Sequence, residues 1–410
     1  MDGHSGEILE FMDQTRHADV TADVVPTEPL DPLVTVGVPH MSVHLSPSGA
    51  TVHTDESGHY TYPGGGALAT GLLRGRYVRI YDDCSYDDIA LSDATTGDLD
   101  YGGVPNPAGS CDVPPNVAGA SNTNAARSAY VHLSHQQHEA RCRFNGCAGA
   151  APFAGFAQAM PVVTNSSTSL CNARWFWGAI YTGPKSPGYC ANTGTNRAVV
   201  IHEWGHAFDT FTQGSAPEKG SGEALADTFA FIETGDGCIA RGFLLGGPCP
   251  TCEPACNGVR DLPPFALGGS RPIARPSNID RPDGLNCGPT VYDPQTGIDA
   301  PRCPVPYAGP MGYQGHCESH IASTANWDLR ESLRSRWGAA AGSVLFEELW
   351  WETAAPARSA YRIAAGGQCN PQSDVDGCAA DNWYRVLMQM DDDNGNLADG
   401  TPNGCRIYDA

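Results

Sequence analysis

The sequence has few basic residues and no long hydrophobic run. Its 410 residues include 24 Lys and Arg against 46 Asp and Glu, which gives a formal net charge of −22. Because such a chain repels a phosphate backbone, we expect no nucleic acid among its partners. Its apolar stretches are much shorter than the roughly 20 residues that a membrane-spanning helix needs. The sequence therefore predicts a soluble protein that has no membrane partner.

A signal peptide is also missing, although the cysteine content indicates export. Residues 1–20 have neither the basic start nor the apolar core of a signal peptide, so we expect Met1 to begin a trimmed fragment. The chain contains 16 cysteines, an even number that is hard to keep reduced outside the cytosol. We interpret most of them as disulfides of a secreted, extracellular protein. Zinc ligation is the alternative at Cys249, Cys252 and Cys256, whose spacing suits a metal cluster.

The first 80 residues have the pattern of short strands. Apolar and polar residues alternate at 33–36, 41–45 and 50–53, and Pro, Gly and Ser turn signals separate these runs. We expect a β-rich lead-in over residues 1–80. It is either the remnant of a prosegment or a small β-sandwich that stays part of the protein.

The motif that carries chemistry is His202-Glu203-Trp204-Gly205-His206. Apolar residues recur at helical spacing around it, which predicts a helix over residues 199–211. On a helix the two imidazoles lie one turn apart, so both can reach one ion at the bond length of about 2.0–2.1 Å that Zn²⁺ prefers. Glu203 follows His202 by one residue, so its side chain leaves the helix in a different direction. It can contact a water on that ion without ligating the ion itself. The motif therefore predicts a zinc site with a carboxylate base.

A catalytic zinc needs a third protein ligand and one open position. The His-x-x-Gly-x-x-His continuation of the metzincins is absent, because Asp209 and Thr212 occupy its positions. Glu223 begins a second predicted helix 17 residues after His206 and is the natural third ligand. Asp227 follows one turn later and can accept the second ring N–H of a ligating histidine, which fixes the orientation of that ring.

With these residues the sequence resembles the thermolysin-like metallopeptidases of the gluzincin group and, more loosely, the fungalysin-like enzymes. The similarity spans about residues 171–337. It implies that Asn172 and Ala173 lie on an edge strand that holds an extended substrate, and that Arg271 binds a substrate carbonyl. It also implies that His316 stabilises the oxyanion, with His320 as a rival for that role. The family's tyrosine donor is missing between His206 and Glu223, and Tyr313 is a stand-in for it.

The resemblance implies an α+β, two-lobed, gluzincin-like fold behind the β-rich segment. Residues 81–211 would form an upper catalytic lobe with the edge strand and the motif helix. Residues 212–410 would form a lower, mainly helical lobe with disulfide-tied loops. The implied activity is that of a secreted, monomeric, zinc-dependent endopeptidase, in which Glu203 activates a zinc-bound water to hydrolyse the peptide bonds of protein or peptide substrates.

Two other functions stay open. One is a secreted binding protein on a peptidase fold, which would be expected to lose the base or a ligand, whereas all four residues are intact. The other is a zinc exopeptidase of the gluzincin aminopeptidase kind, whose Gly-x-Met-Glu-Asn segment is absent. Calcium is a possible second cofactor at the acidic segments 391–400 and 374–377, where a capped acidic turn is the alternative.

Overall fold

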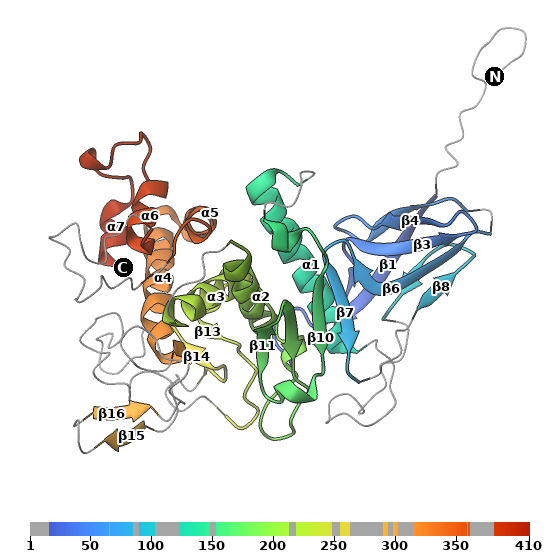
Figure 1. Ribbon diagram of the computed structural model, residues 1–410, viewed down its shortest axis with the longest axis horizontal. Helices are drawn as coiled ribbons and strands as arrows, with labels where there is room; N and C mark the ends of the chain where they lie inside the picture. Colours follow the sequence, from blue (N-terminus) through green and yellow to red (C-terminus); the bar gives the residue numbers. More distant parts are fainter. Residues whose placement is uncertain are drawn as a thin grey trace, which may run out of the picture.

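The computed structural model describes residues 16–64, 66–84, 90–102, 123–147, 153–212, 219–247, 255–262, 290–293, 298–301, 315–358, 360 and 381–410. Helices and mixed sheets both occur, and the N-terminal region is rich in strands. The expectation of an α+β fold with an N-terminal β-rich segment is therefore confirmed. Figure 1 shows the blue N-terminal strands at one end of the molecule, the orange and red C-terminal helices at the other, and α2 and α3 between them.

The N-terminal region contributes to two sheets. In the smaller sheet the order is β2-β1-β5, and β9 pairs with β1 in parallel. In the larger sheet β3, β4, β6 and β8 are joined antiparallel. The bounds of these strands are β1 Arg16–Val24, β2 Val34–Gly37, β3 Met41–Ser46, β4 Ala50–His53, β5 His59–Tyr62, β6 Leu68–Gly75, β8 Leu91–Asp93 and β9 Leu99–Asp100.

The larger sheet continues without a break into the region of the motif helix. Its order is β11-β12-β10-β7-β6-β3-β4, with β7 and β10 parallel. The four further strands are β7 Val78–Asp82, β10 Met160–Thr164, β11 Ala173–Phe176 and β12 Ala179–Thr182. The expected boundary between the β-rich lead-in and the upper catalytic lobe, after residue 80, falls inside β7. Strand β11 lies at the end of the sheet, so one of its edges is not covered by another strand in the described part of the chain.

A long helix, α1, covers this sheet. It spans Asn124–Asn145, and its N-terminus is capped by the side chain of Thr123, which accepts a hydrogen bond from the N–H of Ala126 at 3.1 Å. The helix is buried along much of its length. It packs against β1, β7 and β10, and therefore ties the N-terminal strands to the rest of the molecule.

The remaining helices form the other half of the molecule (Figure 1). Helix α2 packs against α3, α3 against α4, and α4 against α5. Their bounds are α2 Arg197–Thr212, α3 Lys219–Thr234, α4 Gly315–Trp337, α5 Ala339–Ala354, α6 Trp383–Met390 and α7 Gly404–Asp409. Two small antiparallel pairs complete the described structure, namely β13 Cys238–Ile239 with β14 Arg260–Asp261, and β15 Thr290–Asp293 with β16 Ile298–Pro301.

Aromatic side chains fill the core between α2, α3 and α5. Trp204 and Phe229 meet edge to face with ring centroids 5.1 Å apart, and Phe229 lies 4.9 Å from Trp351. All three rings are buried. Large rings of this kind contribute most of the packing energy of a core. The two helices that carry the candidate metal ligands are therefore held rigidly against each other.

Three disulfides join described cysteines, namely Cys142–Cys147, Cys171–Cys190 and Cys238–Cys256. Cys256 is thus a disulfide cysteine and not a ligand of the zinc cluster that the sequence left open, while its neighbours Cys249 and Cys252 lie outside the described residues. Cys405 is an exposed free thiol. Among the described helices, none combines the length and the apolar character needed to cross a bilayer.

Candidate metal centre

Helix α2 places the two motif histidines side by side. The Nε2 atoms of His202 and His206 lie 3.2 Å apart, and the two rings are nearly perpendicular. Both residues lie on the same face of α2 because four residues complete about one helical turn. Burial lowers the pKa of His206 to about 4. Its imidazole is therefore neutral, which is the form that binds a metal.

Helix α3 brings the carboxylate of Glu223 to the same point. One oxygen lies 3.2 Å from His202 Nε2 and the other 3.5 Å from His206 Nε2. Burial acts to raise the pKa of Glu223, but the imidazoles of His316, His206 and His202 outweigh it and hold that pKa well below its usual range. The carboxylate is therefore charged, as a metal ligand must be.

The three donors fit a zinc ion. A tetrahedral ion with bonds of about 2.0–2.1 Å holds its ligand atoms about 3.3–3.4 Å apart. The two imidazole nitrogens are 3.2 Å apart, and each lies 3.2 or 3.5 Å from a different oxygen of the Glu223 carboxylate, so all three distances are close to that value. All three donor atoms lie within 4.8 Å of one another, and the group contains two imidazoles and one carboxylate. Three donors would occupy three positions of a tetrahedral ion, and the fourth position would remain for another ligand.

Asp227 fixes the orientation of His202. Its Oδ1 lies 3.0 Å from His202 Nδ1, which turns Nε2 towards Glu223 and His206. Ser323 on α4 donates a hydrogen bond to the other oxygen of Asp227 at 3.0 Å. Burial acts against a charged His202, but its hydrogen bonds with Asp227 and Glu223 raise its pKa to about 10, so zinc must displace the Nε2 proton of His202 in order to bind there. Asp227 thus lies beside the second ring nitrogen of His202.

Arg260 is a site residue that the sequence did not reveal. It lies on β14 and is buried, its guanidinium donates a hydrogen bond to Asp227 Oδ1, and Nη2 lies 3.9 Å from Glu223. Burial acts to raise the pKa of Asp227, yet the charges of Arg260 and His202 lower it to about 2. No spacing pattern connects Arg260 to the motif, so only the folded chain could identify it. Arg271, the arginine expected here, lies outside the described residues.

Glu203 is buried next to the metal ligands but is not one of the three donors. Its side chain is 6% exposed, and Oε2 accepts a hydrogen bond of 2.6 Å from the backbone N–H of Trp175. Burial raises the pKa of Glu203 to about 7. A carboxylate with this pKa can accept and return a proton near neutral pH.

The edge strand lies directly beside Glu203. Ala173 is the first residue of β11 and is buried, whereas Asn172 immediately precedes the strand and is exposed. The carbonyl of Asn172 accepts hydrogen bonds from Gly183 N–H at 3.1 Å and from Thr193 Oγ1 at 3.0 Å. These bonds hold the start of β11 in place while the side chain of Asn172 faces solvent.

The two candidate oxyanion histidines occupy different surroundings. His316 lies in the first turn of α4, with Nε2 3.3 Å from Glu223 Oε1 and a side chain that is 47% exposed. His320 is buried one turn later, and its Nε2 lies 3.0 Å from the carbonyl oxygen of Asp261. His316 is therefore beside the three-donor group, and His320 is engaged by the backbone. Tyr313 lies outside the described residues.

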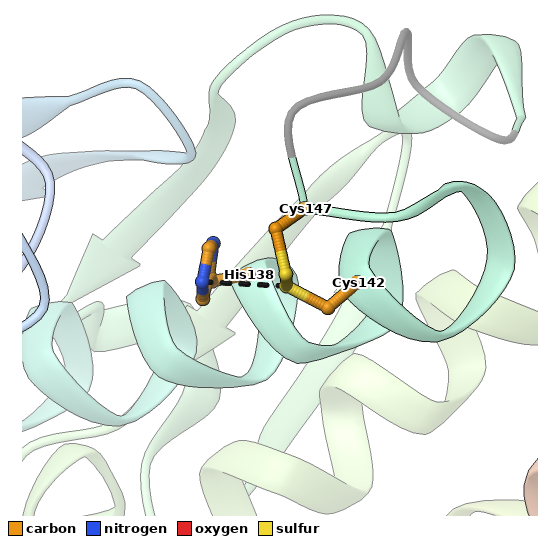
Figure 2. A group of neighbouring side chains, drawn as sticks. All are labelled: His138, Cys142 and Cys147. Carbon is orange, nitrogen blue, oxygen red and sulfur yellow. Dashed lines mark hydrogen bonds between the residues drawn. A yellow bond between two sulfur atoms is a disulfide. The ribbon is translucent and has the colours of Figure 1, made fainter.

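A second group of metal-type donors does not form a metal site in this structure. Figure 2 shows His138 beside Cys142 and Cys147, whose sulfur atoms are joined in a disulfide. His138 Nε2 lies 3.4 Å from Cys142 Sγ and 2.7 Å from Glu56. Because both sulfurs are consumed by the disulfide, His138 serves as a polar contact between α1 and the N-terminal region.

The acidic segment 391–400 has the bonding of a capped turn. Both carboxylate oxygens of Asp391 accept hydrogen bonds, Oδ2 from Thr401 Oγ1 at 2.7 Å and Oδ1 from Asn403 Nδ2 at 2.6 Å. The carboxylate of Asp391 is thus bonded within the turn, and calcium at this segment stays a prediction. The other acidic segment, 374–377, lies outside the described residues.

No protein-family model and no curated protein matches this sequence. Among solved structures, the chain is similar to the precursor of protealysin, a metalloproteinase from Serratia proteamaculans. The two chains share 13% sequence identity at a TM-score of 0.42, and the match covers 80% of this chain and 84% of that one. At this level of similarity the neighbour assigns no family, so the functional argument rests on the site residues themselves.

Proposed function

We propose that this protein is a secreted, zinc-dependent endopeptidase of the thermolysin-like type. The observation that carries the proposal is the convergence of His202, His206 and Glu223 from two helices, with donor separations that suit one tetrahedral ion. A buried carboxylate, Glu203, adjoins this group and is hydrogen-bonded to a sheet edge. A solvated helix face would account for neither the separations nor the burial.

Each residue then has a chemical role. When bound, zinc lowers the pKa of a coordinated water to about 7 and polarises a carbonyl oxygen. Glu203 takes a proton from the attacking water and returns it to the nitrogen of the leaving amine. His316 donates a hydrogen bond to the oxygen that develops negative charge. Although half of its side chain is exposed, partial burial lowers the pKa of His316, which favours the neutral imidazole.

The substrate is a protein or peptide in extended conformation. Strand β11 has one edge without a strand partner in the described structure, and the N–H of Trp175 on that strand points to Glu203. A peptide that extends the sheet at β11 would gain backbone hydrogen bonds and bring a peptide bond close to Glu203. Asn172 and Ala173, at the start of β11, would hold its neighbouring residues.

We further infer that the N-terminal segment is a permanent part of the catalytic unit. Val25 follows β1, and its N–H donates to Ser128 Oγ on α1 at 2.9 Å while its carbonyl lies 2.9 Å from His132 Nε2. The N–H of Arg197, at the start of α2, donates to the carbonyl of Thr27 at 3.0 Å. Removing this segment would expose α1 and release the start of the motif helix. Residues 81–211 and 212–410 remain the proposed lobes around the metal, and because β7 crosses the first boundary, the N-terminal strands belong to the same folded unit as the upper lobe.

Casein digestion with and without a zinc-selective chelator tests the proposal. We expect one zinc per chain by elemental analysis, internal cleavage of casein, and loss of cleavage on chelation that added zinc reverses. Intact casein in the presence of bound zinc would favour the binding-protein function. Release of single terminal residues instead of internal fragments would favour an exopeptidase.

A further inference from the structure

Arg174 is a cation on the edge strand that has no acidic partner among the residues the structure describes. Within the described part of the chain, no carboxylate oxygen lies within 4.0 Å of its guanidinium nitrogens, although the protein carries a net charge of −22. Its only side-chain hydrogen bond in that part of the structure runs from Nη2 to Thr168 Oγ1 at 2.8 Å. A half-buried arginine in so acidic a chain is therefore available to bind an anion from outside.

Two aromatic rings hold the guanidinium in place. Its central carbon lies 5.2 Å from the ring centroid of Phe176 and 5.4 Å from that of Tyr181. Phe176 is two residues further along β11, and Tyr181 is the direct partner of Arg174 on β12. Cation–π contacts of this kind restrict the rotamers of an arginine while leaving its N–H groups able to donate.

The arginine lies on the opposite face of the sheet from the motif helix. Successive side chains of a strand point to opposite faces. Trp175 faces α2, because its indole N–H donates to Thr210 at 3.1 Å and its ring contacts Phe211. Arg174 therefore faces away from α2, and with Phe176 and Tyr181 it lines the outer face of the sheet at its edge.

A peptide that extends the sheet would place one side chain beside Arg174. Directly opposed residues of neighbouring strands have Cβ atoms about 4.5–5.5 Å apart, within reach of an arginine. Because the next residue of β11, Trp175, donates its N–H to Glu203, the opposed substrate residue is close to the reacting bond. A carboxylate at that position would form the ion pair that Arg174 lacks among the described residues.

We propose that Arg174 is a specificity-determining residue that selects an acidic side chain within two residues of the scissile bond. The inference rests on the proposed peptidase function and names its substrate class, which is acidic peptides. Arg174 takes no part in bond cleavage. Arg174 affects kcat/KM, because it binds one side chain of the substrate.

The test uses the zinc-loaded 410-residue chain and internally quenched peptides with a single cleavable bond. Glu, Gln or Lys is placed in turn at each of the two positions on either side of that bond. The variants are Arg174→Gln, Arg174→Glu and, as a matched control, Arg79→Gln. Arg79 is an exposed arginine on β7 that also lies over a tyrosine ring, 4.8 Å from the centroid of Tyr81, but its strand is away from the edge. Zinc content and thermal stability establish that each variant is folded.

We expect the parent to prefer Glu over Gln at one position by about threefold to fivefold in kcat/KM, the range of a partly exposed ion pair. The preference should shrink in 0.5 M salt, about where screening becomes strong. Arg174→Gln should abolish it, Arg174→Glu should shift it towards Lys, and Arg79→Gln should leave it unchanged.

Three results overturn the inference. The parent could show no preference for Glu at any position, or the preference could persist in Arg174→Gln. In both cases peptide cleavage continues, so the proposed peptidase function stands while the role of Arg174 falls. If the zinc-loaded parent cleaves none of the peptides and no casein, both the function and the inference are withdrawn.

Discussion

The backbone N–H of Trp175 donates a hydrogen bond of 2.6 Å to Oε2 of Glu203, and this bond joins strand β11 to helix α2. It places a buried carboxylate at the sheet edge where an extended peptide could bind. Burial raises the pKa of that carboxylate to about 7. The proposed proton acceptor and the proposed substrate-binding strand are thus connected by one hydrogen bond.

Replacing Glu203 by Gln separates the chemistry from the structure. The amide oxygen of Gln can still accept the N–H of Trp175, but the side chain can no longer take a proton. We expect kcat to fall about 10²- to 10⁴-fold, the usual contribution of general base catalysis. Zinc content and thermal stability should match those of the parent. A variant that cleaves casein as fast as the parent would remove Glu203 from the role of base.

The sequence could predict that His202, His206 and Glu223 lie together, because local geometry determines most of the candidate site. Helical spacing alone aligns His202 with His206, and the helix that carries Glu223 needs only to pack against theirs. Arg260 escapes prediction because it reaches Asp227 from a two-residue strand, where no periodicity is available. Contacts of this kind depend on the path of the chain between helices.

Two further features depend on long-range contacts in the same way. His316 and His320 lie one turn apart on α4, so spacing does not distinguish them. Only the fold shows that His316 approaches Glu223 while His320 binds the backbone of Asp261. Likewise, β7 pairs with β10, whose residues lie about 80 positions later in the sequence. No local pattern could therefore show that one sheet continues across the expected boundary after residue 80.

Asp227→Asn should weaken zinc binding and destabilise the fold. Asn carries no charge opposite Arg260, so a buried cation loses its main partner, and the anchor of His202 is weakened. We expect zinc affinity to fall about 10- to 100-fold and the free energy of unfolding to fall by about 3 kcal/mol. Competition with a chromogenic zinc chelator and urea unfolding measure the two effects.

Asp236→Asn is the matched control for that variant. Asp236 also pairs with an arginine, Arg241, but both side chains are 31% exposed. The exposed pair should contribute less than about 1 kcal/mol, and zinc affinity should be unchanged. Equal zinc affinity in Asp227→Asn and Asp236→Asn would contradict the role given to Asp227.

Gly205→Ala should separate the two ligand helices. A Cβ at Gly205 would lie 2.6 Å from the Cα of Ala226 on α3, so backbone must shift to admit it. We expect a loss of about 1–3 kcal/mol of stability from overpacking and weaker zinc binding, because α2 and α3 carry the ligands. Gly222→Ala is the control, since its Cβ would meet Asp209 at an ordinary 3.7 Å. Ala is the better helix former, so stability there should be unchanged or higher. Two variants with the same stability and zinc affinity would contradict the close approach at Gly205.

His132 should make the fold sensitive to mild acid. It is buried on α1, with Nε2 2.9 Å from the carbonyl oxygen of Val25, and burial together with the charge of Arg197 lowers its pKa to about 3. An unfolded histidine titrates near 6.5, so below that pH the unfolded chain binds a proton that the folded chain does not. The stability from neutral His132 is therefore complete above about pH 6.5 and is lost progressively as the pH falls towards 3. At pH 5 the loss amounts to about 2 kcal/mol.

His132→Gln removes this titration while keeping a side chain that can bond the carbonyl of Val25. We expect the variant to be less stable than the parent at pH 7.5, because the packing of the imidazole is lost. Between pH 7.5 and pH 5 the parent should lose about 2 kcal/mol more unfolding free energy than the variant does. Urea unfolding at both pH values, with zinc removed by a chelator so that metal release does not contribute, measures the difference. Equal losses of unfolding free energy in the two proteins would contradict the prediction. They would show that His132 takes up its proton while the protein stays folded, and that the contact between α1 and the segment after β1 is lost in acid.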